Sequence, residues 1–157
     1  MATPYYKTKN YQFQRSIGHL LRKAGKLITT QIEDVFTEQD IGFVQWAILM
    51  KLRTGAVKTA AEICQNMCHN SGAITRVLDQ LEESGLIARE RSTQDRRIVE
   101  LTLTPAGHET TEVFLPLVID LYNSLLEDFS KEEIDILIDL LIRLNAKLSD
   151  YAKPKAS

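Results

Sequence analysis

The sequence predicts a mainly α-helical fold with one small β-hairpin, and three observations carry that prediction. Apolar residues recur with a helical period of about 3.6 residues through most of the chain. Residues 86–103 break this period with two short alternating runs around a polar turn. Thr104-Pro105 then offers a helix start, and the helical pattern returns.

Composition and charge set the frame for this fold. The chain has 157 residues and is 44% hydrophobic, which is enough for one domain with its own core. We expect a soluble, cytoplasmic protein with no membrane contact, because the chain has neither a long apolar run nor a signal-peptide pattern. The net charge of −2 hides an asymmetry, since residues 1–58 carry nine Lys or Arg and four acids, whereas residues 109–150 carry three and ten.

Two helices are expected first. The first runs from Tyr11 to Phe36 and has a single apolar stripe. The second, shorter helix runs from about Ile41 to Leu52. The stripe of the first helix consists of Ile17, Leu20, Leu21, Ala24, Leu27, Ile28, Ile32 and Val35.

A pair of short helices follows. Thr59-x-x-Glu62 is a capping box that begins the third helix. A break at residues 69–71 separates it from the fourth helix, whose end is marked by Gly85, a residue suited to a left-handed stop. The inward face of the fourth helix is expected to be Ile74, Val77, Leu78 and Leu81.

The hairpin and two further helices complete the chain. Residues 86–91 and 98–103 are predicted to be strands, with the turn at residues 92–95. A long helix begins after Thr104 as its N-cap, and the capping box Ser130-x-x-Glu133 begins the last helix.

Two short helices, a tight turn and a hairpin together form a winged helix-turn-helix, and the exposed chemistry of this unit suits double-stranded DNA. Small and polar residues at the start of the fourth helix can approach the major groove, while arginines on a thin hairpin can enter a narrow minor groove. Four of the nine arginines of the chain lie within residues 89–97. The candidate DNA-binding residues are Asn70, Ser71, Gly72, Thr75, Arg76, Arg89, Arg91, Asp95, Arg96 and Arg97. Asp79 fits equally well as an ion-pair partner within the protein or as a DNA-facing group.

The stretch SGAITRVLDQLEESGLIARERSTQDRRIVELTLTPAG, residues 71–107, resembles the multiple antibiotic resistance regulator (MarR) family. It looks like that family's D-x-R-x-x-x-V-x-L-T-x-x-G signature, and Asp95, Arg97 and the strand into Leu103-Thr104 fall in place with one residue of slack, because this chain has L-T-L-T where the family often has L-T alone. The resemblance implies a homodimer, a palindromic operator and a small-molecule or oxidant signal that releases DNA. It also implies that Arg97 is the minor-groove residue and that Asp95 orients the wing arginines.

One domain spanning residues 1–157 is expected. Within it, residues 41–104 are predicted to form the DNA-binding lobe. Residues 10–36 and 105–150 are predicted to form a helical dimerisation lobe, because their apolar stripes are too broad for one small lobe to cover.

An effector site is predicted where the resemblance places the ligand crevice, between the first helices and the DNA-binding lobe. Aromatic groups and basic groups together could hold an aromatic or anionic molecule, although aromatic residues at helical spacing are also typical of a core. The candidate effector-binding residues are Arg15, His19, Arg22, Phe43 and Trp46.

Other functions were weighed against a DNA-binding repressor. Cys64 and Cys68 lie one helical turn apart and leave open a thiol-based redox sensor, but buried thiols are favoured. A metal site is not expected, since zinc needs four ligands, and no cofactor is predicted. We expect no enzymatic activity, because the sequence lacks a phosphate-binding loop and a nucleophile motif. A winged helix that binds protein is the remaining alternative, and the wing arginines argue against it.

Overall fold

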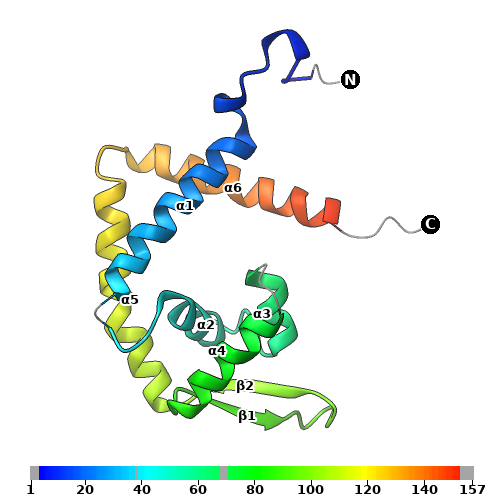
Figure 1. The fold of residues 1–157 in the computed structure, drawn as a ribbon, viewed down its shortest axis with the longest axis vertical. Helices are drawn as coiled ribbons and strands as arrows, with labels where there is room; N and C mark the ends of the chain where they lie inside the picture. The colour runs from blue at the N-terminus through cyan, green and yellow to red at the C-terminus, as the bar shows by residue number, and fades with distance from the viewer. Residues whose placement is uncertain (1–3, 38, 68–70, 153–157) are drawn as a thin grey trace, which may run out of the picture. The chain divides into compact units, whose positions relative to one another are not determined.

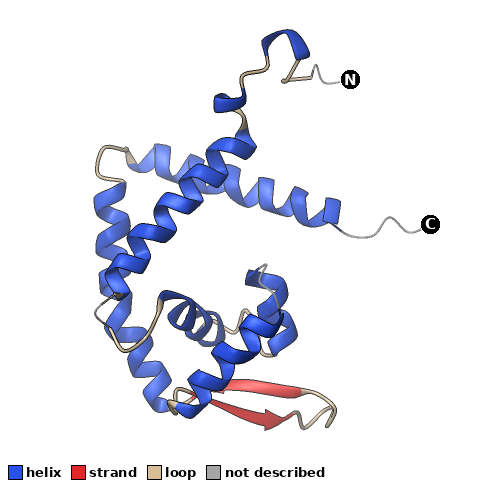
Figure 2. Cartoon of the chain, in the orientation of Figure 1, coloured by secondary structure: helices blue, strands red, loops and turns tan. Residues whose placement is uncertain are grey.

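The computed structural model describes residues 4–37, 39–67 and 71–152. The fold is mainly helical with one antiparallel hairpin, so the predicted fold class is confirmed (Figure 1, Figure 2). The chain divides into two compact units, Met1–Val118 and Ile119–Ser157, and each is described by itself below.

The elements follow one another in the predicted order. They are two short 3-10 helices (Thr8–Asn10 and Phe13–Arg15), α1 (Ile17–Phe36), α2 (Phe43–Arg53), α3 (Ala60–Met67), α4 (Ser71–Glu83), β1 (Ile87–Arg91), β2 (Val99–Leu103), α5 (Pro105–Leu125) and α6 (Lys131–Ala152).

The first helix begins later than its predicted start at Tyr11, so that boundary is wrong. Ser16 is the N-cap of α1, with extended backbone dihedrals of −75° and 141°, and its hydroxyl accepts a hydrogen bond from the His19 N–H (3.4 Å). The Tyr6 hydroxyl accepts another from the Ile17 N–H (2.9 Å). These two side chains satisfy amide groups that a helix start leaves unpaired, and this fixes the boundary.

The start of α3 and the end of α4 agree with the sequence signals. The Glu62 carboxylate accepts hydrogen bonds from the backbone N–H groups of Lys58 (2.6 Å) and Thr59 (3.0 Å), while the Glu62 N–H donates to the Thr59 hydroxyl (3.3 Å). The capping box is therefore confirmed, and its backbone hydrogen bonds, that from Lys58 foremost, hold the pKa of Glu62 below its ordinary value. Gly85 follows α4 with φ at +68°, the left-handed stop that was predicted.

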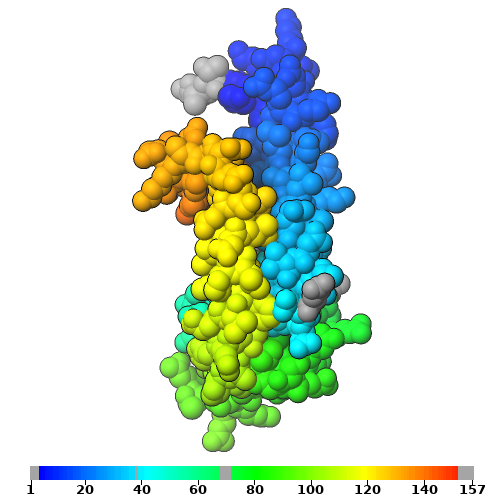
Figure 3. Space-filling view, turned by 90° about the vertical axis from the view of Figure 1, so that its left-hand side faces the viewer, coloured from blue at the N-terminus to red at the C-terminus, as the bar shows by residue number. Residues whose placement is uncertain are grey.

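The core of the first unit gathers side chains from α1 to the first part of α5. Phe36 near the end of α1 stacks on Phe114 of α5, with ring centroids 5.3 Å apart, and Figure 3 shows α1 and α5 side by side there. The most deeply buried side chains of the unit are Ile32, Ile48, Leu49, Ile63, Ile74, Leu78, Leu81 and Thr111. The predicted inward face of α4 is thereby confirmed for three of its four members, and Val77 is half-buried.

The hairpin is tied to the rest of the first unit at its base. β1 pairs antiparallel with β2, and Arg89 lies opposite Leu101. The Leu101 N–H donates outward to the Lys58 carbonyl (2.7 Å), which covers part of the free edge of β2. Thr104 donates from its hydroxyl to the Gly85 carbonyl (2.6 Å) and accepts from the Gly107 N–H (3.1 Å), so it serves both as the predicted N-cap of α5 and as a link to the end of α4.

The second unit contains the end of α5 and the whole of α6. Ser130 and Glu133 exchange side-chain-to-backbone hydrogen bonds of 2.9 and 3.2 Å, which confirms the second capping box. Along α6, large apolar side chains are exposed in the single chain, namely Ile136, Leu137, Ile138, Leu140, Ile142 and Leu148. Within the described residues, we find no helix with the length and apolarity required to cross a membrane.

Candidate nucleic-acid interface

Helix α4 has one buried face and one exposed face. Ile74 and Leu78 are each only 1% exposed and anchor the helix in the core. Gly72, Thr75 and Arg76 are exposed. The helix therefore offers a small residue, a hydroxyl and a guanidinium along one side, a set of groups able to approach and hydrogen-bond base edges. Asn70 lies outside the described residues, and of Ser71 only its place in the helix is described.

The tip of the hairpin, residues 92–98, is a compact turn. The Ile98 N–H donates to the Asp95 carbonyl and the Ser92 N–H to the Ile98 carbonyl, both at 2.9 Å. The Asp95 carboxylate accepts from the Arg97 N–H (2.9 Å). Asp95 thus shapes the turn through the Arg97 backbone, which is how it can orient an arginine without pairing with its guanidinium.

Three arginines are exposed on or beside this tip. Arg96 and Arg97 belong to the turn itself, and Arg91 ends β1 just before it. This cluster of positive charge lies at the tip of the thin hairpin that β1 and β2 form (Figure 2), and it is suited to the negative potential of a DNA groove.

Arg89 differs from the other wing arginines because its guanidinium is held by α4. Its Nη2 lies 2.6 Å from the Asp79 Oδ1, and its Nε lies 3.3 Å from the Glu82 Oε2. Asp79 was expected to be either an ion-pair partner within the protein or a DNA-facing group, and the structure shows it in the ion pair. Whether Arg89 also contacts DNA stays a prediction, and two of its three guanidinium nitrogens already face carboxylates of α4.

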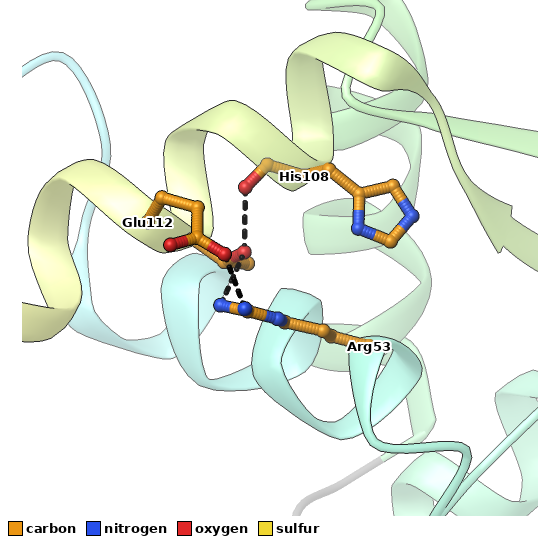
Figure 4. Close-up of polar contacts among 4 residues, drawn as sticks. Arg53, His108 and Glu112 are labelled. Carbon is orange, nitrogen blue, oxygen red and sulfur yellow. Dashed lines mark hydrogen bonds and ion pairs between the residues drawn. The ribbon is translucent and has the colours of Figure 1, made fainter.

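The first unit has a second polar link, between α2 and α5. Arg53 donates to the hydroxyl of Thr111 (3.3 Å) and pairs with Glu112, and Thr111 in turn donates to the His108 carbonyl (2.7 Å) (Figure 4). Thr111 is fully buried, so this contact fixes the end of α2 on the first turns of α5.

The structure divides the predicted effector set among three places. His19 and Arg22 border a hollow of about 440 Å³ at the start of α1, which Tyr11 and Phe13 also line. Arg15 lies off the helix, beside a separate hollow of about 380 Å³. Arg15 therefore does not lie on α1 with His19 and Arg22, although the first helix was expected to begin at Tyr11 and so to include all three.

Phe43 and Trp46 belong to an aromatic cluster in the core. Both pack on Phe36, at centroid distances of 5.9 and 5.8 Å, and Trp46 is only 6% exposed. Among the described residues, the buried Trp46 Nε1 and His19 Nδ1 have no hydrogen-bond partner. Packing accounts for both rings, since Trp46 lies in the core and Phe43 is half-buried against Phe36.

The structure describes only one of the two cysteines of the proposed thiol-based redox sensor. Cys64 is a half-buried free thiol on α3, and Cys68 lies outside the described residues. In the part of the chain that the structure describes, no three His, Cys, Asp or Glu side chains gather as a set of metal ligands.

Sequence reasoning missed Glu82 and the Arg53 contact. Asp79 and Glu82 are three residues apart on a helix and therefore share a face, a signal that could have suggested a two-carboxylate site for one arginine. Nothing in the sequence pattern indicated that Arg53 would meet residues of α5, because that pairing joins segments far apart in the chain.

An exposed helix of a helix-turn-helix beside an arginine-tipped hairpin defines the class of winged helix DNA-binding regulators. Residues 43–99 match the family model described as "MarR family". The HTH-type transcriptional regulator FarR of Neisseria gonorrhoeae is 29% identical over 86% of this chain and 92% of its own length.

Solved structures agree with this assignment. The apo form of wild-type MarR from E. coli is 27% identical, with a TM-score of 0.71 over 82% of this chain and 96% of that chain. A mutant MarR from E. coli complexed with operator DNA is 26% identical, with a TM-score of 0.71 over 86% of this chain and 99% of that chain. Residues 43–99 thus match the MarR family, and the chain is a transcriptional regulator with the DNA-binding fold of MarR proteins.

Proposed function

We propose that this regulator is a homodimeric repressor that binds a palindromic operator and is released by a small-molecule effector. The observation that carries the proposal is the exposed side of α4, with Thr75 and Arg76, next to an arginine-bearing hairpin tip. The DNA complex of an E. coli MarR supports it, since that protein has the same fold and binds operator DNA.

On this proposal α4 lies in the major groove and the wing in the adjacent minor groove. Thr75 and Arg76 contact base edges, with Asn70, Ser71 and Gly72 at the start of the helix close to the DNA backbone. Arg97 enters the minor groove, and Arg91 and Arg96 contact phosphates beside it. Phosphate contacts that position the protein, contacts to base edges and contacts in the minor groove are thus made by different side chains.

The dimer is supported by apolar surface that the single chain leaves exposed. On α1 the exposed large apolar residues are Ile17, Leu20, Leu21, Leu27 and Ile28, and α6 adds the six named above. Monomeric proteins rarely expose so much apolar surface on their helices. We therefore assign residues 10–36 and 105–150 to dimerisation and residues 41–104 to DNA binding, within one domain of residues 1–157. A two-fold dimer would present two copies of α4 to a palindrome.

The effector proposal is narrowed by the geometry to the hollow at the start of α1. There the Arg22 guanidinium and the His19 ring lie beside Phe13 and Tyr11, a combination of cationic and aromatic groups. An aromatic or anionic molecule fits that chemistry, and the other candidates, Arg15, Phe43 and Trp46, lie outside this hollow.

Selection from a random-sequence DNA library tests the proposal, followed by gel shifts of the selected duplex at two salt concentrations. We expect an enriched inverted repeat, bound by two chains, with affinity that falls steeply as salt rises because phosphate contacts release counterions. Failure of the wild-type chain to enrich any sequence would exclude operator reading and favour the protein-binding alternative. The same gel shift with candidate aromatic acids tests release.

A further inference from the structure

The contact between Arg89 and the two acids of α4 is the polar link between the wing and the proposed recognition helix. Arg89 projects from β1, while Asp79 and Glu82 stand one turn apart on α4, at 2.6 and 3.3 Å from its nitrogens. The three side chains are 31%, 50% and 43% exposed, so the contact lies at the surface. An ion pair so exposed contributes little to the stability of the fold, and its role has to be sought elsewhere.

The packing around this contact leaves room for the hairpin to tilt. A hollow of about 250 Å³ lies between α4 and the strands, lined mainly by apolar side chains, with Thr75 and Arg89 at its border. A two-stranded hairpin is a weak unit by itself and takes its direction from what it touches. The base of the hairpin is held by the buried side chains of Ile87 and Leu101 and by the hydrogen bond from Leu101 to Lys58. Beside the hollow, the ion pairs of Arg89 add a direct link between β1 and α4.

The charges of Asp79 and Glu82 are unfavourable for DNA binding, which indicates that these residues have another role. Asp79 and Glu82 place two carboxylates on the helix that the proposed function directs at a polyanion, where electrostatics alone disfavours them. Beside them, two of the three guanidinium nitrogens of Arg89 face these carboxylates.

We propose that Arg89, Asp79 and Glu82 form a positioning clamp that fixes the wing relative to α4, and so fixes the step along DNA between the bases read by α4 and the minor groove entered by Arg97. The inference rests on the proposed function, because only a protein that reads both grooves has such a step. It assigns Arg89 to positioning rather than to DNA contact.

The two roles for Arg89 predict opposite signs for one substitution. If Arg89 gripped phosphate, Asp79→Asn would free it and remove a repulsive charge, so DNA binding would strengthen. For a clamp, Asp79→Asn and Glu82→Gln loosen the wing, so binding to the selected duplex weakens by about threefold to tenfold despite the lost negative charge. Glu83→Gln is the matched control, since Glu83 is an exposed acid of α4 for which no ion pair is recorded among the described residues.

The experiment measures gel-shift affinity, after titration of the active fraction, for two duplexes. The first is the duplex selected by the wild-type chain. In the second, one base pair is inserted between the bases that α4 reads in the major groove and the minor-groove site that Arg97 enters. The wild-type chain should prefer the first, and the Asp79→Asn and Arg89→Gln variants should lose most of that preference. A loss of fold stability alone would weaken both duplexes equally and leave the preference intact.

The outcomes separate the inference from the proposed function. The clamp is overturned if the Asp79→Asn and Arg89→Gln variants keep the wild-type preference between the two duplexes, or if they bind DNA as Glu83→Gln does. It is also overturned if Arg89→Gln flattens the salt dependence of binding by about one unit, because that would show a phosphate contact. Arg89→Lys keeps the charge and can reach one carboxylate, so partial recovery of the preference supports it. If the wild-type chain enriches no sequence, the proposed function itself fails.

Discussion

Replacing Gly107 with alanine should destabilise the protein, although alanine is the better helix former. A Cβ built at Gly107 would stand 2.1 Å from the Leu86 carbonyl oxygen, where ordinary contact begins at 3.4 Å. That oxygen belongs to rigid backbone and already accepts a hydrogen bond from the Thr104 N–H (3.2 Å). The first turn of α5 and the segment between α4 and β1 would therefore have to separate.

The magnitude follows from two opposing effects. Overpacking of this kind costs about 1–3 kcal/mol. Alanine in a helix recovers about 0.5–1 kcal/mol relative to glycine. The difference lies between about 0 and 2.5 kcal/mol. The 2.1 Å approach to a backbone oxygen favours its upper part, about 1–2.5 kcal/mol, which in a chain of this size lowers the melting temperature by roughly 2–10 °C.

Urea and thermal unfolding followed by circular dichroism measure this loss. Gly25→Ala is the control, because Gly25 also lies within a helix but its added Cβ meets nothing within 4 Å, so this variant should gain stability. A Gly107→Ala chain as stable as Gly25→Ala would refute the close-approach argument.

Four further predictions concern DNA, assembly and pH. Arg97→Ala should weaken binding to selected and random duplexes alike and flatten the salt slope by about one unit, with the fold unchanged by circular dichroism; an unaltered slope contradicts the wing assignment. Arg76→Ala should lower affinity for the selected duplex by about tenfold or more and for random DNA much less, because an arginine paired with guanine discriminates by about 1–3 kcal/mol; equal losses on both duplexes would mean that it holds only phosphate. Leu148→Glu, at a side chain 54% exposed in the single chain, should shift sedimentation from dimer to monomer or aggregate; a wild-type chain that sediments as a monomer rules the dimer out. Glu62→Gln should destabilise the protein at neutral pH, and the difference from wild type should vanish as pH falls through the lowered pKa of Glu62, since a depressed carboxylate pKa adds stability only above it; a difference that persists in acid would point to a cause other than this charge.

The parts of the fold that the sequence predicted correctly depend on interactions between residues that are close together in the chain. The capping boxes at Thr59 and Ser130 and the stop at Gly85 each depend on residues within one helical turn, so their signals are complete in the sequence. The start of α1 was placed too early, at Tyr11, although the apolar stripe begins only at Ile17, directly after the cap at Ser16.

The candidate site was predictable only in part, for a physical reason. Exposure of Thr75 and Arg76 follows from helical spacing once the apolar face is known. The partners of Arg89 do not, because they depend on how close β1 comes to α4, and all three side chains would look like solvated charges in the sequence. The same holds for the effector set, whose members the sequence placed together and the structure places apart.

The anchoring of the hairpin has a consequence for how such a regulator can diversify. Its base is bonded to the surrounding structure through Lys58, Gly85 and α4, whereas the hydrogen bonds described for its tip, residues 92–98, are made within the hairpin. Substitutions at exposed tip positions such as Thr93 or Arg96 therefore do not change the hydrogen bonds and ion pairs that hold the base of the hairpin. If the wing contacts DNA as proposed, DNA preference can therefore change through single substitutions at the tip, while the bonds at the base of the hairpin stay the same.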